Sequence, residues 1–320
     1  MANINNLLIM IIYLAGGVTG NLNPVWRKIS RSPEIFMNGF RRVLEDEGFL
    51  AGGESRHWIL YDAVPLTKEN EDMELYLAGN PPWINQGLYD KTIAKHRPYI
   101  LESFYYADKD TERLLPYFGD FLLDSGAFTF MMGNHKKEID WDAYLEKYTD
   151  FINRNNIDKF FELDIDSIVG YQKVLYYRER LEKLTNKQPI IVWHKTRGSE
   201  IWKKECEEYP YVAIGGFAAK ELSKNEYKYI PSMISYAHKN NTKVHGLGFT
   251  QTSLLPKFHF DSVDSTAWTT GNRFGYIYKF RDGKMEKIFT PEGKRLESRK
   301  AALNNFIEWN KYSEWAKTHL

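Results

Sequence analysis

One stretch decides the fold: "YVAIGGFAAKELSKNEYKYIPSMISYAHKNNTKVHGLGF", residues 211–249. It opens with an apolar run at 211–216 and closes with another at 243–249, and both runs contain glycines near their ends. Between them, residues 228–241 carry apolar side chains at helical spacing. Near-continuous apolar strands separated by helices are typical of a parallel sheet with both faces covered. The stretch therefore predicts a strand, a helix and a second parallel strand.

The same alternation extends along most of the chain. The other apolar runs are "MELYLAG" (73–79), "YILESF" (99–104), "DFLLDSG" (120–126), "KFFELDID" (159–166), "PIIVWH" (189–194) and "FHFDSVDS" (258–265). Eight runs with helical patterns between most of them predict an α/β fold of the (β/α)8 TIM-barrel type. A doubly wound open sheet is the alternative that strand counting leaves open.

Two regions lie outside this repeat. We expect residues 1–71 to form an N-terminal extension that packs on the barrel, and residues 72–320 to form the barrel domain. Within the latter, "YIYKFRDGKMEKIF" (276–289) has Asp282-Gly283 between alternating residues, which predicts a β-hairpin. Residues 298–320 predict a closing amphipathic helix.

Composition excludes several classes of protein. Hydrophobic residues make up 43% of the 320 residues, which is enough for a large core. The one cysteine, Cys206, excludes an internal disulfide and a thiolate zinc site, and no required metal or cofactor is expected. The apolar segment at 7–17 is too short to span a bilayer, and the first basic residue, Arg27, follows it. A cytoplasmic protein without a membrane partner is expected.

Positive charge gathers near the carboxyl terminus. The net charge of the whole chain is only +1, but residues 273–300 hold nine Lys or Arg and four acids. Four of these basic residues lie in the predicted hairpin: Lys279, Arg281, Lys284 and Lys287. Such a segment could bind nucleic-acid phosphates, and a merely solvated surface is the alternative.

Polar residues and glycines gather near the carboxyl ends of the apolar runs. They are Asp124, Asp164, Asp166, His194, Gly215, Gly216, His245 and Asp264. The active sites of TIM barrels form at this rim, so the clustering predicts an enzyme.

Each of these residues also has a structural interpretation. Asp124 could cap the following helix, and either histidine could be a hydrogen-bonded core residue. Period-2 alternation would place Glu162, Asp164 and Asp166 on one strand face, where carboxylates need a cation or hydrogen-bond donors. The backbone N–H groups of the adjacent glycines could bind an oxygen atom, or the pair could simply form a turn.

Five motifs in order carry a family resemblance. The chain has "LLDSGAF", "ELDID", "AIGGFAAKE", "VHGLGF" and "FDSVDS". This order, with barrel spacing, resembles the tRNA-guanine transglycosylase superfamily, in which the pieces are DSGG(F/Y)Q, FDE, GG(L/F)..GE, MG(V/I)G and FD(C/S). The resemblance covers roughly residues 73–270. The chain looks most like the phage-encoded branch that inserts 7-deazaguanine bases into DNA.

The resemblance implies roles for individual residues. Asp264 would be the nucleophile and Asp124 the acid/base group, and Asp164, or otherwise Asp166, would read the edge of guanine. His194 falls near the family's base-reading glutamine. Phe128 and His245 would cover the two faces of the base. Backbone contacts to the base would come from Gly215, Gly216 and Phe217.

The register of the last motif is open between two aspartates. Laying the family strand V-D-L-F-D-C on "FDSVDS" puts Asp264 at the nucleophile and Asp261 at an earlier, structural aspartate. A literal match to "FDS" would instead make Asp261 the nucleophile, so Asp261 is kept among the candidate substrate-binding residues. Asp264 is preferred because it lies nearer the carboxyl end of the strand.

Departures from the family bear on the substrate. No cysteine follows Cys206, so the zinc site of the bacterial and eukaryotic tRNA enzymes is missing. The chain ends soon after its barrel, and Asp-Ser-Gly-Gly has become Asp-Ser-Gly-Ala. The expected partners are therefore guanine sites in DNA and a 7-deazaguanine base such as preQ0. Action on tRNA, action on free nucleosides as a nucleosidase or deoxyribosyltransferase, and a nonenzymatic nucleic-acid-binding role are the alternatives. The oligomeric state is open, and a homodimer is one form it could take.

Overall fold

The structure, a computed structural model, describes residues 73–79, 97–132, 139–249, 251–271, 274–291 and 296–320. The predicted N-terminal extension, residues 1–71, lies outside these described residues. Its packing on the barrel therefore stays a prediction.

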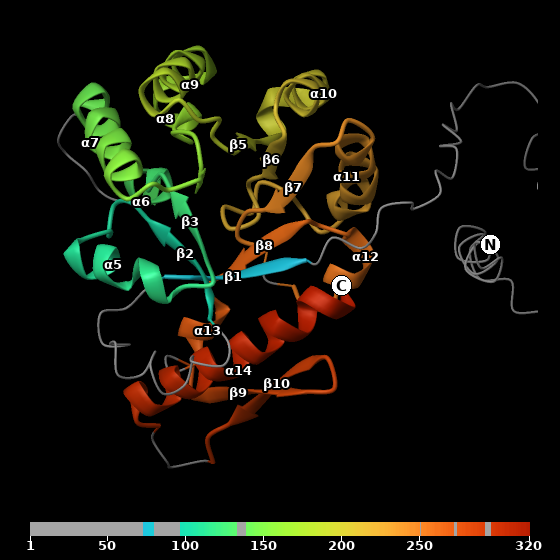
Figure 1. Cartoon of the computed structure of the whole chain (residues 1–320). Coiled ribbons are helices and arrows are strands. Elements are labelled where there is room, and N and C mark those ends of the chain that lie inside the picture. The colour runs from blue at the N-terminus through green and yellow to red at the C-terminus, as the bar shows by residue number, and fades with distance from the viewer. Residues whose placement is uncertain (1–72, 80–96, 133–138, 250, 272–273, 292–295) are drawn as a thin grey trace, which may run out of the picture. The chain divides into compact units, whose positions relative to one another are not determined.

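Eight parallel strands form one sheet in the order β4-β3-β2-β1-β8-β7-β6-β5 (Figure 1). They are β1 (Glu74–Ala78), β2 (Tyr99–Ser103), β3 (Asp120–Asp124), β4 (Lys159–Phe160), β5 (Ile191–Trp193), β6 (Tyr211–Ile214), β7 (Lys243–Gly246) and β8 (Ser262–Ser265). Each strand comes from one of the eight apolar runs.

The two ends of this strand order also meet. Phe161, just after β4, forms a parallel bridge with Ile190, just before β5. The N–H of Ile190 donates to the Phe160 carbonyl over 2.8 Å, and the N–H of Glu162 donates to the Ile190 carbonyl over 3.0 Å. The sheet therefore closes, which confirms the (β/α)8 barrel. The open doubly wound sheet was the wrong alternative.

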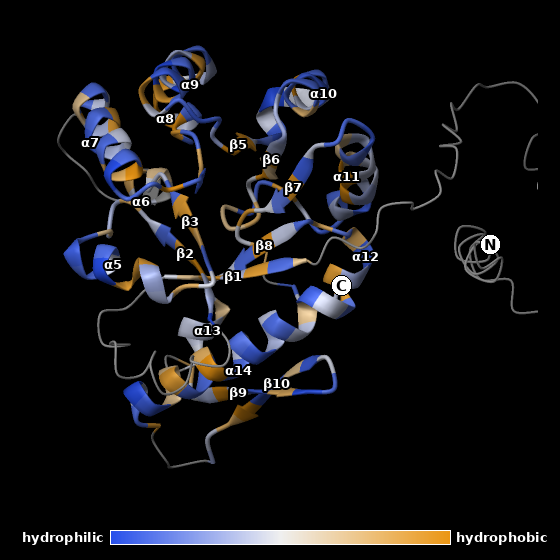
Figure 2. Cartoon of the chain, viewed as in Figure 1, coloured by the Kyte–Doolittle hydropathy of each residue, from blue (hydrophilic) through white to orange (hydrophobic). Residues whose placement is uncertain are grey.

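Helices follow the strands and surround the sheet (Figure 1). After β2 and β3 come α5 (Lys109–Leu114), α6 (Ala127–Met132) and α7 (Trp141–Arg154), and after β4 come α8 (Asp166–Val169) and α9 (Tyr171–Thr185). The later strands are followed by α10 (Gly198–Glu208), α11 (Ile230–Lys239), α12 (Leu255–Phe258) and α13 (Ala267–Thr270). Short 3-10 turns lie at Leu115–Tyr117, Lys195–Arg197 and Glu226–Tyr229. In Figure 2, hydrophobic residues lie along β1 and β3, and hydrophilic residues are frequent on the helices.

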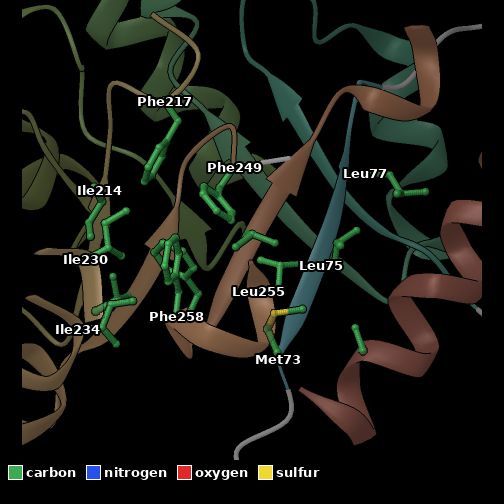
Figure 3. Packing of buried hydrophobic residues seen from close by; sticks show 14 of the residues in the cluster. Met73, Leu75, Leu77, Ile214, Phe217, Ile230, Ile234, Phe249, Leu255 and Phe258 are labelled. Atoms are coloured by element: carbon green, nitrogen blue, oxygen red, sulfur yellow. The ribbon is translucent and has the colours of Figure 1, made fainter. Parts of the chain in front are cut away.

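Strand alternation divides the core into two parts. Tyr76, Leu122 and Val192 point into the barrel and form one cluster there. Their neighbours along the strands, such as Leu75 and Leu77, point outward into a larger cluster (Figure 3). Because successive residues of a strand face opposite sides, both faces of every strand are buried. This explains why the runs read as continuously apolar.

The amino end of the barrel is filled by a compact ion cluster. Lys159 Nζ lies 2.9 Å from Glu74 Oε2 and 2.5 Å from Asp120 Oδ2. The hydroxyl of Tyr76 donates to the same two carboxylates. One cation thus binds two carboxylates at this end, away from the carboxyl rim.

The C-terminal elements confirm the predicted hairpin and closing helix. Strands β9 (Tyr276–Arg281) and β10 (Lys284–Phe289) pair antiparallel, and α14 (Ser298–His319) packs beside β9. The hairpin turn has positive φ at Asp282 (47°) and Gly283 (75°), as a type I′ turn requires. Side chains of α14 cover the edge of β9: Tyr278 N–H donates to Asn305 over 2.7 Å, and Phe280 N–H donates to Glu308 over 2.8 Å.

Candidate functional site

Two aspartates lie at the carboxyl rim of the barrel. Asp124 is the last residue of β3, and Asp264 is the third residue of β8. Burial raises the pKa of Asp124 to about 7; a hydrogen bond from the Gly126 N–H opposes this shift, and the charges of Asp164 and Asp264 add to it. Asp124 is therefore close enough to Asp164 and to Asp264 for both carboxylates to disfavour its charged form.

Asp264 is held through one of its two oxygens. Oδ1 accepts hydrogen bonds from the Gly248 N–H over 2.5 Å and from His245 Nε2 over 3.2 Å. Among the described residues, Oδ2 has no hydrogen-bond partner. The side chain is thus fixed in position while one oxygen stays available to a reacting group.

His245 belongs to a buried chain of hydrogen bonds that ends at Asp264. Its Nδ1 lies 2.5 Å from Ser262 Oγ, which lies 2.5 Å from the Tyr211 hydroxyl. Because a carboxylate oxygen only accepts, Nε2 of His245 donates to Asp264. The chain thus connects the Tyr211 hydroxyl through Ser262 and His245 to Asp264.

This placement changes the role expected for His245. The side chain is 0% exposed, and its ring contacts Phe161 at 5.3 Å between centroids. A residue without exposed surface cannot cover one face of a base. His245 instead forms a buried hydrogen bond that holds the Asp264 side chain in position.

A second group of polar residues follows β4, β5 and β6. His194 donates from Nε2 to Asp164 Oδ1 over 2.8 Å and from Nδ1 to Glu221 Oε2 over 3.0 Å. Burial disfavours the charged ring, but Asp164 and then Glu221 outweigh it and raise the pKa of His194 to about 9. Burial also raises the pKa of Asp164, against the effect of His194. At neutral pH His194 is thus an imidazolium that donates to two carboxylates.

Sequence reasoning missed the residue that holds this group together. Arg197, whose side chain is 2% exposed, lies 3.0 Å from Asp166, 3.2 Å from Glu162, 3.4 Å from Glu205 and 3.8 Å from Asp164. It follows β5 directly, in "HKTRGSE" (194–200). Glu162, Asp164 and Asp166 lie close together in the sequence and need a cation nearby. This need could have pointed to Arg197.

The prediction that these carboxylates share one strand face was wrong for Glu162. Phe161 points into the barrel, so Glu162 points outward, where it binds Arg178 through Nε over 2.8 Å. The strand ends there, and Asp166 begins α8. Asp164 and Asp166 are therefore brought together by the turn after β4 and by Arg197.

One set of residues has the spacing of a metal site. Ligand atoms of Asp164, Asp166 and His194 all lie within 4.8 Å of one another. However, Arg197 already supplies positive charge to both carboxylates. Both ring nitrogens of His194 also have carboxylate partners already, Asp164 and Glu221. The arrangement fits a hydrogen-bonded ion network better than a metal centre.

The two glycines after β6 make room for the same network. A Cβ atom at Gly215 would lie 2.9 Å from His194 Cε1, and one at Gly216, where φ is 82°, would lie 2.9 Å from Glu221 Oε2. The N–H of Gly215 donates to the Trp193 carbonyl over 2.9 Å. The expected contact of that N–H with a base is therefore wrong, while the contact expected of Gly216 stays a prediction.

The two expected aromatic residues give different results. The side chain of Phe217 packs outward against Phe249, at 5.0 Å between ring centroids (Figure 3). Only its backbone remains as a candidate contact for a base. The side chain of Phe128 lies outside the described part of the structure, so its stacking role stays a prediction.

The structure decides between the two registers of the last motif. Asp261 precedes β8 at the amino end of the barrel, where it accepts from the Val244 N–H over 2.6 Å and from His238 Nε2 over 2.8 Å. Asp264 lies at the opposite end, beside Asp124. Asp261 is thus structural, as the preferred register expects, and this position does not fit a substrate-binding role or the literal register.

The four basic residues of the hairpin do not form one patch. Cross-strand pairing and alternation put Lys279, Arg281 and Lys284 on one face and Lys287 on the other. Lys279 also pairs with Glu308 over 3.2 Å, and Lys287 lies over the Tyr276 ring at 4.7 Å. The charge available to phosphates is smaller than the sequence indicated.

Comparisons with known proteins add little. No family model matches the chain, and no curated protein matches it. A solved structure from Coccidioides immitis, provisionally described as a fructose-1,6-biphosphate aldolase, is 11% identical, with a TM-score of 0.47 over 78% of this chain and 90% of that one. This likeness carries no argument about activity. Of the helices in the described ranges, none has the length and apolar character to cross a membrane.

Arg197 generates a stability prediction. Arg197→Met leaves four carboxylates without their shared cation, so the free energy of unfolding should fall by about 3–5 kcal/mol. The control is Arg154→Met, because Arg154 is half-exposed and pairs with Asp150 at the surface, where a pair contributes about 1 kcal/mol or less. Urea unfolding of both variants measures the difference. Equal losses in the two variants would contradict the assigned role.

Proposed function

We propose that this protein is a guanine transglycosylase that acts on DNA. It would exchange guanine for a 7-deazaguanine base such as preQ0 through a covalent aspartyl intermediate. One observation carries the proposal: Asp124, with a pKa of about 7, lies at the barrel rim close to Asp264, which keeps one oxygen without a partner among the described residues. An acid and a nucleophile side by side are what glycosyl transfer with retention needs.

The first half of the reaction breaks the bond to guanine. The target nucleotide leaves the base stack, at a cost of a few kcal/mol. Oδ2 of Asp264 then attacks C1′ as the C1′–N9 bond breaks, and the electron pair of that bond stays on guanine. Asp124 gives its proton to the departing base. The product is an ester between Asp264 and the sugar.

The second half reverses these roles. The incoming 7-deazaguanine gives its N9 proton to the Asp124 carboxylate and attacks C1′ with N9. The ester bond breaks, its electron pair returns to Asp264, and the sugar keeps its configuration. No water and no redox step is required.

The environments of the two aspartates support this division of labour. The pKa of Asp124 is raised to about 7, so this group can both give and take a proton at neutral pH. The hydrogen bonds from Gly248 and His245 hold Oδ1 of Asp264 in place and leave Oδ2 for the attack on C1′. These differences favour Asp124 as the acid and Asp264 as the nucleophile.

Asp164 is the best candidate for recognition of the base. Its Oδ1 is bound by His194, while Oδ2 has no hydrogen-bond partner among the described residues. The Watson–Crick edge of guanine presents two adjacent donors, and 7-deazaguanines keep that edge. A carboxylate oxygen fixed from behind by His194 and Arg197 could accept from it. Asp166, which is bound to Arg197 through Nε, is the weaker candidate.

Two observations favour DNA over tRNA as the substrate. The chain has no cysteine after Cys206 with which to build the zinc site of the tRNA enzymes. Arg281 and Lys284 face the same side of the hairpin and could contact phosphates.

The nucleophile can be identified by trapping the intermediate. Asp264→Asn should abolish the covalent adduct between protein and DNA on denaturing gels, because an amide does not attack C1′. Asp261→Asn should retain it, since Asp261 lies at the other end of the barrel. Circular dichroism checks that both variants fold. An adduct that survives in folded Asp264→Asn would contradict the mechanism.

The pKa of Asp124 sets the pH dependence. The raised pKa means that the proton is present below pH 7 and is lost as the pH rises through about 7. The single-turnover rate of adduct formation should therefore level off below pH 7 and fall above it, by about tenfold for each pH unit. Rapid-quench measurements between pH 5.5 and 9 test this. A rate that rises through pH 7 would mean that Asp124 accepts a proton in this step.

Parallel exchange assays show whether DNA or tRNA is the preferred substrate. Labelled guanine replacement should be faster in DNA than in unmodified tRNA or free deoxyguanosine at matched salt. The pair Arg281→Gln and Lys284→Gln should weaken DNA binding and lower its salt dependence by roughly one unit for each phosphate contact removed. Lys287→Gln, on the opposite face, is the matched control. Faster exchange in tRNA would remove the DNA assignment and leave the chemistry standing.

A further inference from the structure

Two exposed tyrosines lie beside the acid/base candidate. Tyr105 and Tyr106, on the loop that follows β2, are 40% and 64% exposed. The N–H of Phe104 donates to the Asp124 carbonyl over 2.8 Å, so this loop is attached to the end of β3. A Cβ atom at Gly126 would lie only 2.9 Å from the Cβ of Tyr105. The tyrosine pair thus stands on the rim next to the loop that holds Asp124.

Tyr105 is supported from behind by other aromatic rings. Its ring contacts Phe130 at 5.1 Å and Tyr106 at 4.9 Å between centroids. Phe130 in turn packs on Tyr144 at 5.2 Å, and the Tyr144 hydroxyl donates to the Ser125 carbonyl over 2.7 Å. Phe130 and Tyr144 therefore link the tyrosine pair to Ser125, the residue that follows Asp124.

The backbone of this loop is also fixed. The N–H of Tyr106 donates to the Ser103 carbonyl over 2.9 Å, and the N–H of Ala107 donates to the same carbonyl over 3.1 Å. Asp108 then caps α5 through the N–H of Asp110 over 2.8 Å. A ring on a fixed backbone loses little conformational entropy when it binds a flat partner.

We infer that Tyr106, supported by Tyr105, stacks on a nucleobase next to the target nucleotide of a single nucleic-acid strand. The inference rests on the proposed function for the identity of the partner. When the target base leaves the stack, a neighbouring base loses a stacking partner and exposes one face. An exposed phenol ring beside Asp124 can replace that partner, and it accepts any base because every base has a π face.

The test measures binding without requiring exchange. Fluorescence anisotropy of the full chain with a labelled single-stranded DNA that holds one guanine gives the Kd at several salt concentrations. Tyr106→Ala should raise the Kd by about five- to a hundredfold, with an unchanged salt slope because no phosphate contact is removed. Tyr106→Phe should bind like the parent, since stacking does not need the hydroxyl.

Two controls make the result specific. Tyr176→Ala removes another exposed tyrosine, on α9, and should leave the Kd unchanged. A strand with abasic sites on both sides of the guanine should bind the parent and Tyr106→Ala equally. A parent-like Kd for Tyr106→Ala, or no binding of the parent to any single strand, would overturn the inference. Binding that depends on Tyr106 without any base exchange would support the stacking surface and refute the proposed chemistry.

Discussion

The barrel depends on a buried carboxylate at the junction where the sheet closes. Between β4 and β5 the ladder is short, with a single bridge from Phe161 to Ile190. Glu162 continues the connection with its side chain, because Oε1 accepts the N–H of Val192 over 3.0 Å. The same carboxylate binds Arg178 from α9 and Arg197 from the turn after β5. One side chain thus joins two strands and the helix between them.

This junction and the candidate site share Arg197. Its guanidinium contacts Glu162 on the outer side of the barrel and Asp166 at the rim. A buried ion network of this kind gains little stability relative to apolar packing, but removal of one member leaves uncompensated charge. The geometry of the rim carboxylates is therefore tied to the closure of the sheet, and a change at Arg197 should affect both.

The sequence predicted those features that depend on local pattern. Eight apolar runs gave the strands, because burial on both faces removes polar residues from them. Asp282-Gly283 gave the hairpin, since these residues adopt positive φ. Asp264 could be preferred over Asp261 because it comes later in the chain. The later residues of a parallel strand lie nearer the carboxyl rim of the barrel.

The features that were missed depend on contacts between distant segments. Arg197 lies after β5 and its carboxylate partners after β4 and in α10, so no local pattern links them. The support of Asp264 by His245 requires the pairing of β7 with β8, in which His245 lies opposite Ser262. The outward direction of Glu162 follows from the inward direction of Phe161, which only the closed sheet fixes.

The two ends of the barrel differ in how their carboxylates are compensated. At the amino end, Lys159 lies between Glu74 and Asp120 and forms an ion pair with each of them. At the carboxyl end, His194 and Arg197 compensate Asp164, while in the described part of the chain no cation pairs with Asp124. The Asp124 carboxylate is half-buried near two like charges, and loss of solvation first and these charges second raise its pKa to about 7.

If only stability mattered, the Asp124 carboxylate would contact a cation, as Glu74 and Asp120 do at the amino end, or would be replaced by an uncharged residue. An uncompensated acid beside a carboxylate with an available oxygen is costly to folding and useful in proton transfer. This contrast within one barrel is the physical reason to place the chemistry at Asp124 and Asp264. It holds for any glycosyl transfer at this rim, whichever base or polymer the protein accepts.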